Sequence, residues 1–281
     1  MNRRDQSPSR QPLRPRRRSL RPSRRVWGVL ILGVLLVLLI CGRFMPGEGT
    51  DFSRALLPPV DGGLLGTDHF GRSVAVTVWD AAGGSALAAL ITAAVTTAIG
   101  AGIGVVSTLS NGLSKVSTGL LIATLVVPSM LFTFIVVGIL GGGRTAIMVT
   151  VALTHWPLAA QLIGPKVREE WTSGWVRFDR CLGAGRTQIL RWHVLPAAGG
   201  RVAAAMAVIF PSAVVHEATT AFLGIGVDPA AVSLGPLIAW GQSDMTVGAW
   251  WTLVVPTCAL MVLLLPPTIL ARRLGERPRS L

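Results

Sequence analysis

The sequence has few of the side chains that soluble enzymes use for chemistry. Only 14% of its 281 residues are charged, and it contains four histidines and three cysteines. No cluster of His, Asp or Cys marks a catalytic centre. Cys41, Cys181 and Cys258 lie far apart and form no CxxC pair, so each is interpreted as a small apolar side chain. We therefore predict that the chain is not an enzyme and binds no cofactor or metal.

Acidic residues are also scarce: 13 Asp and Glu stand against 26 Lys and Arg, which gives a formal net charge of +13. Such a balance can indicate nucleic-acid binding. We reject that interpretation because ten of the basic residues lie within residues 1–25 and the others flank apolar runs. Residues 1–25 are predicted to be a disordered basic tail that fixes topology or contacts anionic lipid.

Long apolar runs dominate the rest of the chain, and 51% of all residues are hydrophobic. Residues 26–42 are long enough to cross a bilayer and lack a clear cleavage site, so they are predicted to form a retained first transmembrane helix. Residues 43–83 form a mixed loop, and 84–272 form a core with five more helices. The uncharged stretches that hold these helices are 80–115, 115–144, 144–166, about 202–223 and 244–272. We predict an all-α integral membrane protein with six transmembrane helices.

The distribution of basic residues predicts the orientation of these helices. If the N-terminus lies inside, 22 of the 26 Lys and Arg fall on the cytoplasmic side. The N-terminus, the C-terminal basic tail 273–281 and the polar segment 166–201 are then cytoplasmic, and the loop 43–83 is extracytoplasmic. This is the topology N-in/C-in.

The segment 166–201 is the one long polar stretch in the second half of the chain. Its large apolar residues are spaced four, three and four apart, which places them on one face of a helix. They are Trp171, Trp175, Phe178 and Leu182. The glycines at 183 and 185 are expected to break this helix, and Leu195-Pro196 to close the segment. Its apolar face needs a partner, either the lipid interface or a groove on a soluble protein.

The same segment resembles the cytoplasmic coupling loop of ABC importer permeases. The resemblance rests on Gly183, on His193 ten residues later, and on Val194-Leu195-Pro196. The family's E-A-A residues fall on Arg177-Phe178-Asp179, so that part of the motif is lost. The resemblance implies that the loop contacts an ATPase, and the residues assigned to that contact are Trp175, Arg177, Phe178, Asp179, Leu182, Gly183, Ala184, Leu195 and Pro196.

Other motifs resemble the C-type subunit of dipeptide, oligopeptide and nickel permeases. Residues 64–73, LLGTDHFGRS, resemble the segment before its second helix. They also imitate a phosphate-binding loop, but Arg replaces Lys and no strand precedes them. Trp156-Pro157, Ser233-Leu234-Gly235 and Trp250-Trp251 match further family positions, so the resemblance covers about residues 60–260.

Glu217 is the only acid well inside a predicted span, and His216 lies beside it. Because a carboxylate within a membrane is costly, it is a candidate for the translocation path. The alternative is a carboxyl that packs helices or subunits together. The surrounding residues resemble E-A-x-x-S-F-L-G-L-G-V of the same family, which shares the Glu across different substrates. We therefore favour the structural role. Gly100-x-x-x-Gly104 additionally predicts a close helix approach.

The resemblance implies a bacterial inner-membrane permease subunit that forms half of a path for di- or oligopeptides. Its implied partners are a second permease, two cytoplasmic ATPase subunits, an extracytoplasmic solute-binding protein and the bilayer, without nucleic acid. Nickel or a metal chelate is an alternative cargo. A stand-alone secondary transporter or channel is a further alternative, for which only Glu217 could serve as an intramembrane ion ligand.

Overall fold

The computed structural model describes residues 49–108, 111–225 and 233–275, and these residues are mostly helical. Apart from one isolated bridge between Thr67 and Ser73, the described residues contain no β-structure. The α-helices are α2 (Val74–Val106), α3 (Asn111–Val126), α4 (Ser129–Ile139), α5 (Gly143–Trp171), α6 (Gly174–Cys181), α7 (Arg186–Ile189), α8 (Leu195–Phe222), α9 (Leu234–Asp244) and α10 (Trp251–Gly275). Short turns, η1 (Phe52–Arg54), η2 (Leu190–Val194) and η3 (Met245–Val247), complete the elements.

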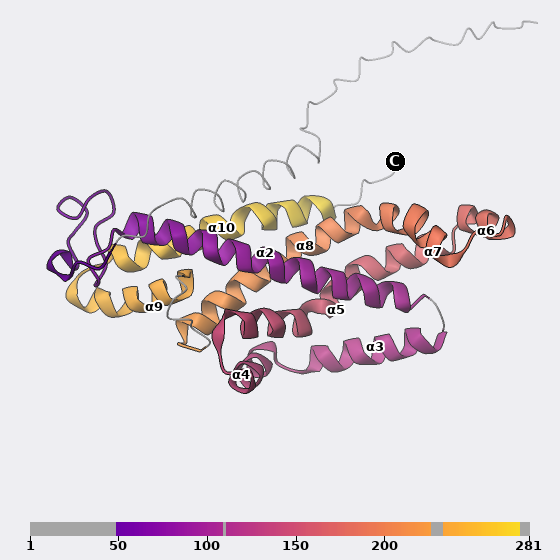
Figure 1. Ribbon diagram of the computed structural model, residues 1–281, viewed down its shortest axis with the longest axis horizontal. Coiled ribbons are helices and arrows are strands. Elements are labelled where there is room, and N and C mark those ends of the chain that lie inside the picture. The colour runs from indigo at the N-terminus through magenta and orange to yellow at the C-terminus, as the bar shows by residue number, and fades with distance from the viewer. Residues whose placement is uncertain (1–48, 109–110, 226–232, 276–281) are drawn as a thin grey trace, which may run out of the picture.

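Three long helices, α2, α5 and α8, form the centre of an elongated bundle, and α10 packs against α2, α8 and α9 (Figure 1). Small residues bring α2 and α5 together. A side chain at Gly100 would overlap Ala159 and come within 2.8 Å of the carbonyl oxygen of Trp156. A Cβ at Gly104 would lie 3.3 Å from the Cα of Gly164. The close approach predicted from Gly100-x-x-x-Gly104 is therefore confirmed.

Several buried hydroxyl groups in these helices donate to carbonyls of their own helix. Thr92 and Thr96 donate to the carbonyls of Ala88 and Thr92, and Thr150 donates to that of Ala146. These three hydroxyls need no water, which suits helices in an apolar solvent. The buried Thr97 hydroxyl has no hydrogen-bond partner among the described residues.

Among the described residues, four helices are long and apolar enough to span a membrane: Val74–Val106, Gly143–Trp171, Arg186–Phe222 and Trp251–Arg272. A fifth candidate is the pair α3 and α4, which is bent by 90°. The first predicted span, residues 26–42, and the basic tails 1–25 and 276–281 lie outside the described residues.

The stretch between Lys115 and Arg144, predicted to hold one span, contains two helices that are bent by 90° relative to each other. α3 ends at Val126, and α4 begins after Pro128, which is its N-cap with extended backbone. Proline lacks the N–H that would continue the helix and disfavours helical backbone in the residue before it. The apolar content of the stretch could not reveal this bend.

Two boundaries also differ from those expected. α2 begins at Val74, so residues 74–83 belong to the helix rather than to the preceding loop, and Asp80 is an exposed residue of its second turn. Cys181 and Cys258 are free and exposed.

The polar parts of the molecule lie at opposite ends of the bundle (Figure 1). The loop 49–73 and α9 occupy one end, and α6 occupies the other. The beginning of α3, which contains Lys115, and the end of α5, which contains Arg168, lie toward the same end as α6 (Figure 1). Their common location agrees with a single basic face of the protein.

Candidate functional site

α6 is a short helix that presents an apolar ridge to solvent. Ser173 caps it by accepting a hydrogen bond from the N–H of Val176, and the Val176 side chain is fully buried in the core. On the outside, Trp175, Phe178 and Leu182 are 80%, 61% and 72% exposed. We call these three residues the exposed ridge. Buried Val176 holds the helix in place, while the ridge packs against no other part of the described chain.

Trp171 does not belong to this ridge, in contrast to the prediction of one stripe from 171 to 182. It is the last residue of α5, and Thr172-Ser173 separate it from α6. Its ring is half-buried against the core, and the guanidinium of Arg180 lies 4.8 Å from the ring centroid. Arg180 Nη2 also donates to the carbonyl of Trp171, at 3.4 Å. This contact ties α6 to the end of α5.

Gly183 ends the loop's helix as predicted. Its φ of +88° lies in the left-handed region, and its N–H donates to the carbonyl of Arg180 at 3.0 Å. Ala184 follows with a bond to the carbonyl of Asp179 and packs partly buried against the core. A Cβ added at Gly183 would meet nothing within 4 Å, so the backbone conformation alone favours glycine here.

The prediction that Leu195-Pro196 closes the polar segment was wrong. Both residues lie inside one continuous helix, Arg186–Phe222, in which η2 is a π-helical turn. Pro196 is tolerated because it occupies the first turn of α8, where a missing N–H costs little after the π turn. Leu195 and Pro196 are exposed, whereas Ile189 and Val194 are buried.

The residues at the lost E-A-A positions divide between two environments. Asp179 Oδ2 lies 2.6 Å from Nε2 of His193, so α6 and the π turn are joined by a polar contact. Arg177 is exposed and pairs with no acidic side chain of the described residues. The surface around the ridge is therefore basic.

Glu217 forms a second polar group far from α6. Its side chain is buried, and Oε1 lies 3.1 Å from Nε of Arg144 at the start of α5. His216 points to another partner: its ring centroid lies 4.7 Å from that of His155 on α5. Sequence reasoning assigned Arg144 to a loop and missed this ion pair, since only the antiparallel packing of α5 and α8 brings the residues together. Glu217 also lies near the end of α8 rather than in the middle of the span.

The coupling residues and Glu217 are not one site. The axis from Arg186 to Glu217 is roughly 45 Å long at 1.5 Å per residue. The continuous helix Arg186–Phe222 runs between the two regions.

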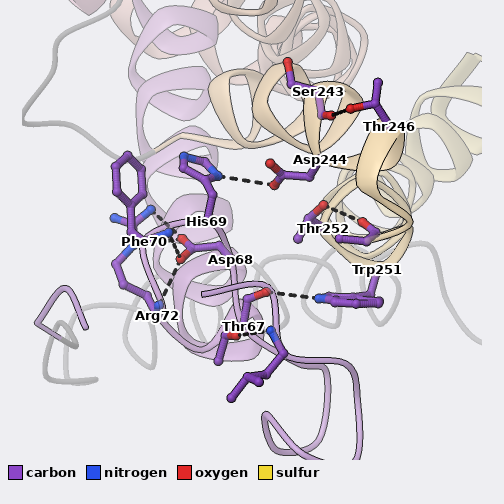
Figure 2. Close-up of polar contacts among 12 residues, drawn as sticks. Thr67, Asp68, His69, Phe70, Arg72, Ser243, Asp244, Thr246, Trp251 and Thr252 are labelled. Carbon is purple, nitrogen blue, oxygen red and sulfur yellow. Dashed lines mark hydrogen bonds and ion pairs between the residues drawn. The ribbon is translucent and has the colours of Figure 1, made fainter. Parts of the chain in front are cut away.

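The LLGTDHFGRS segment, 64–73, folds into a tight turn (Figure 2) at the end of the molecule opposite α6 (Figure 1). The Asp68 carboxylate accepts from the N–H groups of Phe70 and Arg72, both at 2.9 Å, and from Nε of Arg72 at 2.8 Å. Because Asp68 already neutralises Arg72, the segment is not a phosphate-binding loop. Gly71 has a φ of +73°, and a Cβ there would overlap the carbonyl group of Asp51.

This turn is fixed to the last two helices (Figure 2). Trp251 Nε1 donates to the carbonyl of Thr67 at 3.0 Å, and His69 Nδ1 lies 3.2 Å from Oδ2 of Asp244. At the exposed edge of the loop, the hydroxyl of Ser53 and the backbone N–H of Ser53 both donate hydrogen bonds to the carboxylate of Asp51. These two bonds, the hydroxyl bond first, lower the pKa of the Asp51 carboxyl. The motif thus closes the end of the bundle opposite α6.

Comparison with known proteins places these features in a family. A family model described as binding-protein-dependent transport system inner membrane component matches residues 94–280. A putative peptide transport system permease protein of Brucella suis is 27% identical over 240 residues, covering 85% of this chain and 81% of the relative.

Two further relatives are similar. The dipeptide transport system permease protein DppC of Bacillus subtilis is 25% identical, covering 82% of this chain and 73% of the relative. The di/tripeptide transport system permease protein DppC of Pseudomonas aeruginosa is 28% identical, covering 82% and 80%.

A solved structure shares the fold. It is the inward-facing MetNI methionine ABC transporter, with a TM-score of 0.52 and 17% sequence identity, covering 69% of this chain and 94% of that one. Since the family model matches well over half of the sequence, the chain belongs to the binding-protein-dependent transport system inner membrane components, the permease family of ABC importers.

Proposed function

We propose that this chain is one transmembrane subunit of an ATP-driven importer and forms half of the translocation path for di- or oligopeptides. The family description and the peptide permease names of the relatives support this cargo class. The proposed partners are a second permease, two cytoplasmic ATPase subunits and an extracytoplasmic binding protein. In this proposal the ATPase subunits hydrolyse ATP, and the chain itself is the non-catalytic transmembrane subunit of the importer.

The observation that carries this proposal is the exposed ridge of Trp175, Phe178 and Leu182. Aromatic and aliphatic side chains that are 61–80% exposed at the end of a rigid bundle form a surface suited to a groove on another protein. Arg177 beside the ridge supplies positive charge. The exposed ridge therefore supports its assignment as the ATPase docking surface although the E-A-A motif is absent.

The proposed topology has six spans, with 26–42 as the first and both termini in the cytoplasm of a bacterial cell. The shared location of α6, Lys115 and Arg168 supports it, because basic residues are retained on the cytoplasmic side. In this orientation α6 faces the ATPases and the 49–73 loop faces the binding protein.

The geometry suggests how a push on α6 would reach the membrane. Closure of the ATPase dimer displaces the ridge, and α6 transmits the force through two contacts: Val176 in the core and Arg180 on Trp171. The Arg180 contact joins it to α5, while the Asp179–His193 contact joins it to the helix Arg186–Phe222. These helices then move as levers between inward-open and outward-open states. The push biases that equilibrium only if the docking contacts differ in strength between the two states.

Glu217 and His216 are proposed to hold α5 and α8 together at the ends distant from α6, rather than to bind cargo. The Arg144–Glu217 pair holds the beginning of α5 against the end of α8, so the two helices move together. This supports the structural role favoured from the sequence.

The test is retention of the ATPases by the purified complex. We expect Phe178→Asp to lose them, because a carboxylate on the ridge disfavours burial in an apolar groove. The matched control is Phe52→Asp, since Phe52 is similarly exposed, at 69%, but lies at the opposite end of the molecule. Equal retention of ATPases by both variants would contradict the assigned docking surface.

A further inference from the structure

A groove of about 300 Å³ lies between α2, α3 and α5, near the end of the bundle that carries α6. Its lining changes character along its length. Ile103, Leu121 and Trp156 line it with apolar surface, whereas Ser107, Ser114 and Arg168 bring polar groups to it. No residue of the proposed coupling or Glu217 groups lines this groove.

The groove exists because α5 presents small residues where α3 diverges from it. Ala160, Gly164 and Pro165 lie along its wall. Along α5, Trp156 and Arg168 are separated by roughly 18 Å at 1.5 Å per residue. One leaflet contributes about 15 Å to a hydrocarbon core of about 30 Å, so the groove extends over the depth of a single leaflet.

The polar end of the groove carries one positive charge that no carboxylate neutralises. Arg168 Nη2 donates to Ser114 Oγ at 2.9 Å, which bridges α5 to α3 and leaves further guanidinium donors available. The adjacent carboxylates of Glu169 and Glu170 share one cation, since Lys166 Nζ lies 3.0 Å from Glu169 and 2.7 Å from Glu170, and neither pairs directly with Arg168. Among the described residues, Arg168 pairs with no acidic side chain.

We propose that this groove binds one anionic glycerophospholipid of the leaflet on the α6 side. The phosphate lies at Arg168, the Ser107 and Ser114 oxygens accept from headgroup hydroxyls, and an acyl chain follows the apolar wall toward Trp156. The match of charge, polarity gradient and single-leaflet depth favours lipid over a peptide cargo. A zwitterionic peptide would need an acidic partner for its amino group, and the described lining contains none.

The test uses the full chain, with its copurifying subunits, in nanodiscs of phosphatidylcholine that contain a defined fraction of phosphatidylglycerol. Native mass spectrometry after release counts retained phosphatidylglycerol. We expect Arg168→Gln to weaken retention about tenfold, the cost of about one charge-assisted hydrogen bond. Arg272→Gln is the matched control, an exposed arginine at the end of α10 that does not line the groove. Ala160→Phe, which fills the apolar part and keeps the charge, should also reduce retention.

A phosphatidylglycerol with a photoreactive acyl chain provides an independent measurement. We expect cross-links to the segments around Trp156 and Leu121 in the wild-type chain, and their loss in Ala160→Phe. Equal retention by wild type and Arg168→Gln, or cross-links confined to α10, would overturn the proposal. Displacement of the bound lipid by a dipeptide would overturn it too, and would assign the groove to the translocation path.

Discussion

Removing Arg144 should destabilise the protein more than it impairs transport. Glu217 is buried, with its side chain only 8% exposed, and its charge is balanced by Arg144 at 3.1 Å. Breaking a buried pair by removing one partner typically costs about 3–5 kcal/mol. The Arg144 side chain is 27% exposed, so water already screens part of the interaction, and we expect about 2–3 kcal/mol for Arg144→Met.

The double variant Arg144→Met/Glu217→Met should recover much of that loss, because no uncompensated charge remains in the bundle. Thermal unfolding of the purified chain in detergent, followed by tryptophan fluorescence, compares the single variants Arg144→Met and Glu217→Met with the double variant.

Glu217→Gln should keep peptide uptake in proteoliposomes once protein amounts are equalised. A Glu217→Gln protein of normal stability that has lost uptake would refute the structural role and place the carboxylate in the path.

Three further outcomes are expected. Gly183→Val should insert normally but transport less peptide per ATP hydrolysed, because a φ of +88° costs an L-residue about 1–2 kcal/mol. Coupled uptake and ATPase assays measure the ratio of peptide transported to ATP hydrolysed. Gly71→Ala should loosen the outer loop, since its Cβ overlaps the carbonyl of Asp51, and limited proteolysis between 49 and 73 should become faster. Asp68→Ala should lower the melting temperature, because it leaves two N–H groups and Arg72 without their acceptor, at about 1–3 kcal/mol. Unchanged ratios, cleavage rates or melting temperatures would contradict the respective interpretations.

The sequence predicts those features of the fold that depend on composition and local spacing. Runs without charge identified the long helices, and Gly183 marked the end of α6 because a left-handed backbone favours glycine. The Gly100-x-x-x-Gly104 spacing identified the α2–α5 contact, where no Cβ can fit at Gly100.

Features that depend on tertiary packing could not be predicted in this way. Trp171 has the right spacing for the ridge, but Arg180 and the core hold it at the end of α5. Pro196 looks like a terminator, yet a π turn accommodates it in a continuous helix. Arg144 is adjacent to Glu217 only because α5 and α8 are antiparallel. In each case the role of the residue is set by a neighbouring element whose geometry residue spacing does not reveal.

The central claim, that α6 receives the push of the ATPase, is tested most directly by cross-linking at Phe178. A photoreactive residue placed there, in the assembled complex in native membranes, should cross-link to an ATPase subunit, with a yield that changes when ATP is added. The same probe at position 52 should give no such product. Cross-links from position 178 to lipid alone, or to a protein of the extracytoplasmic side, would contradict the account.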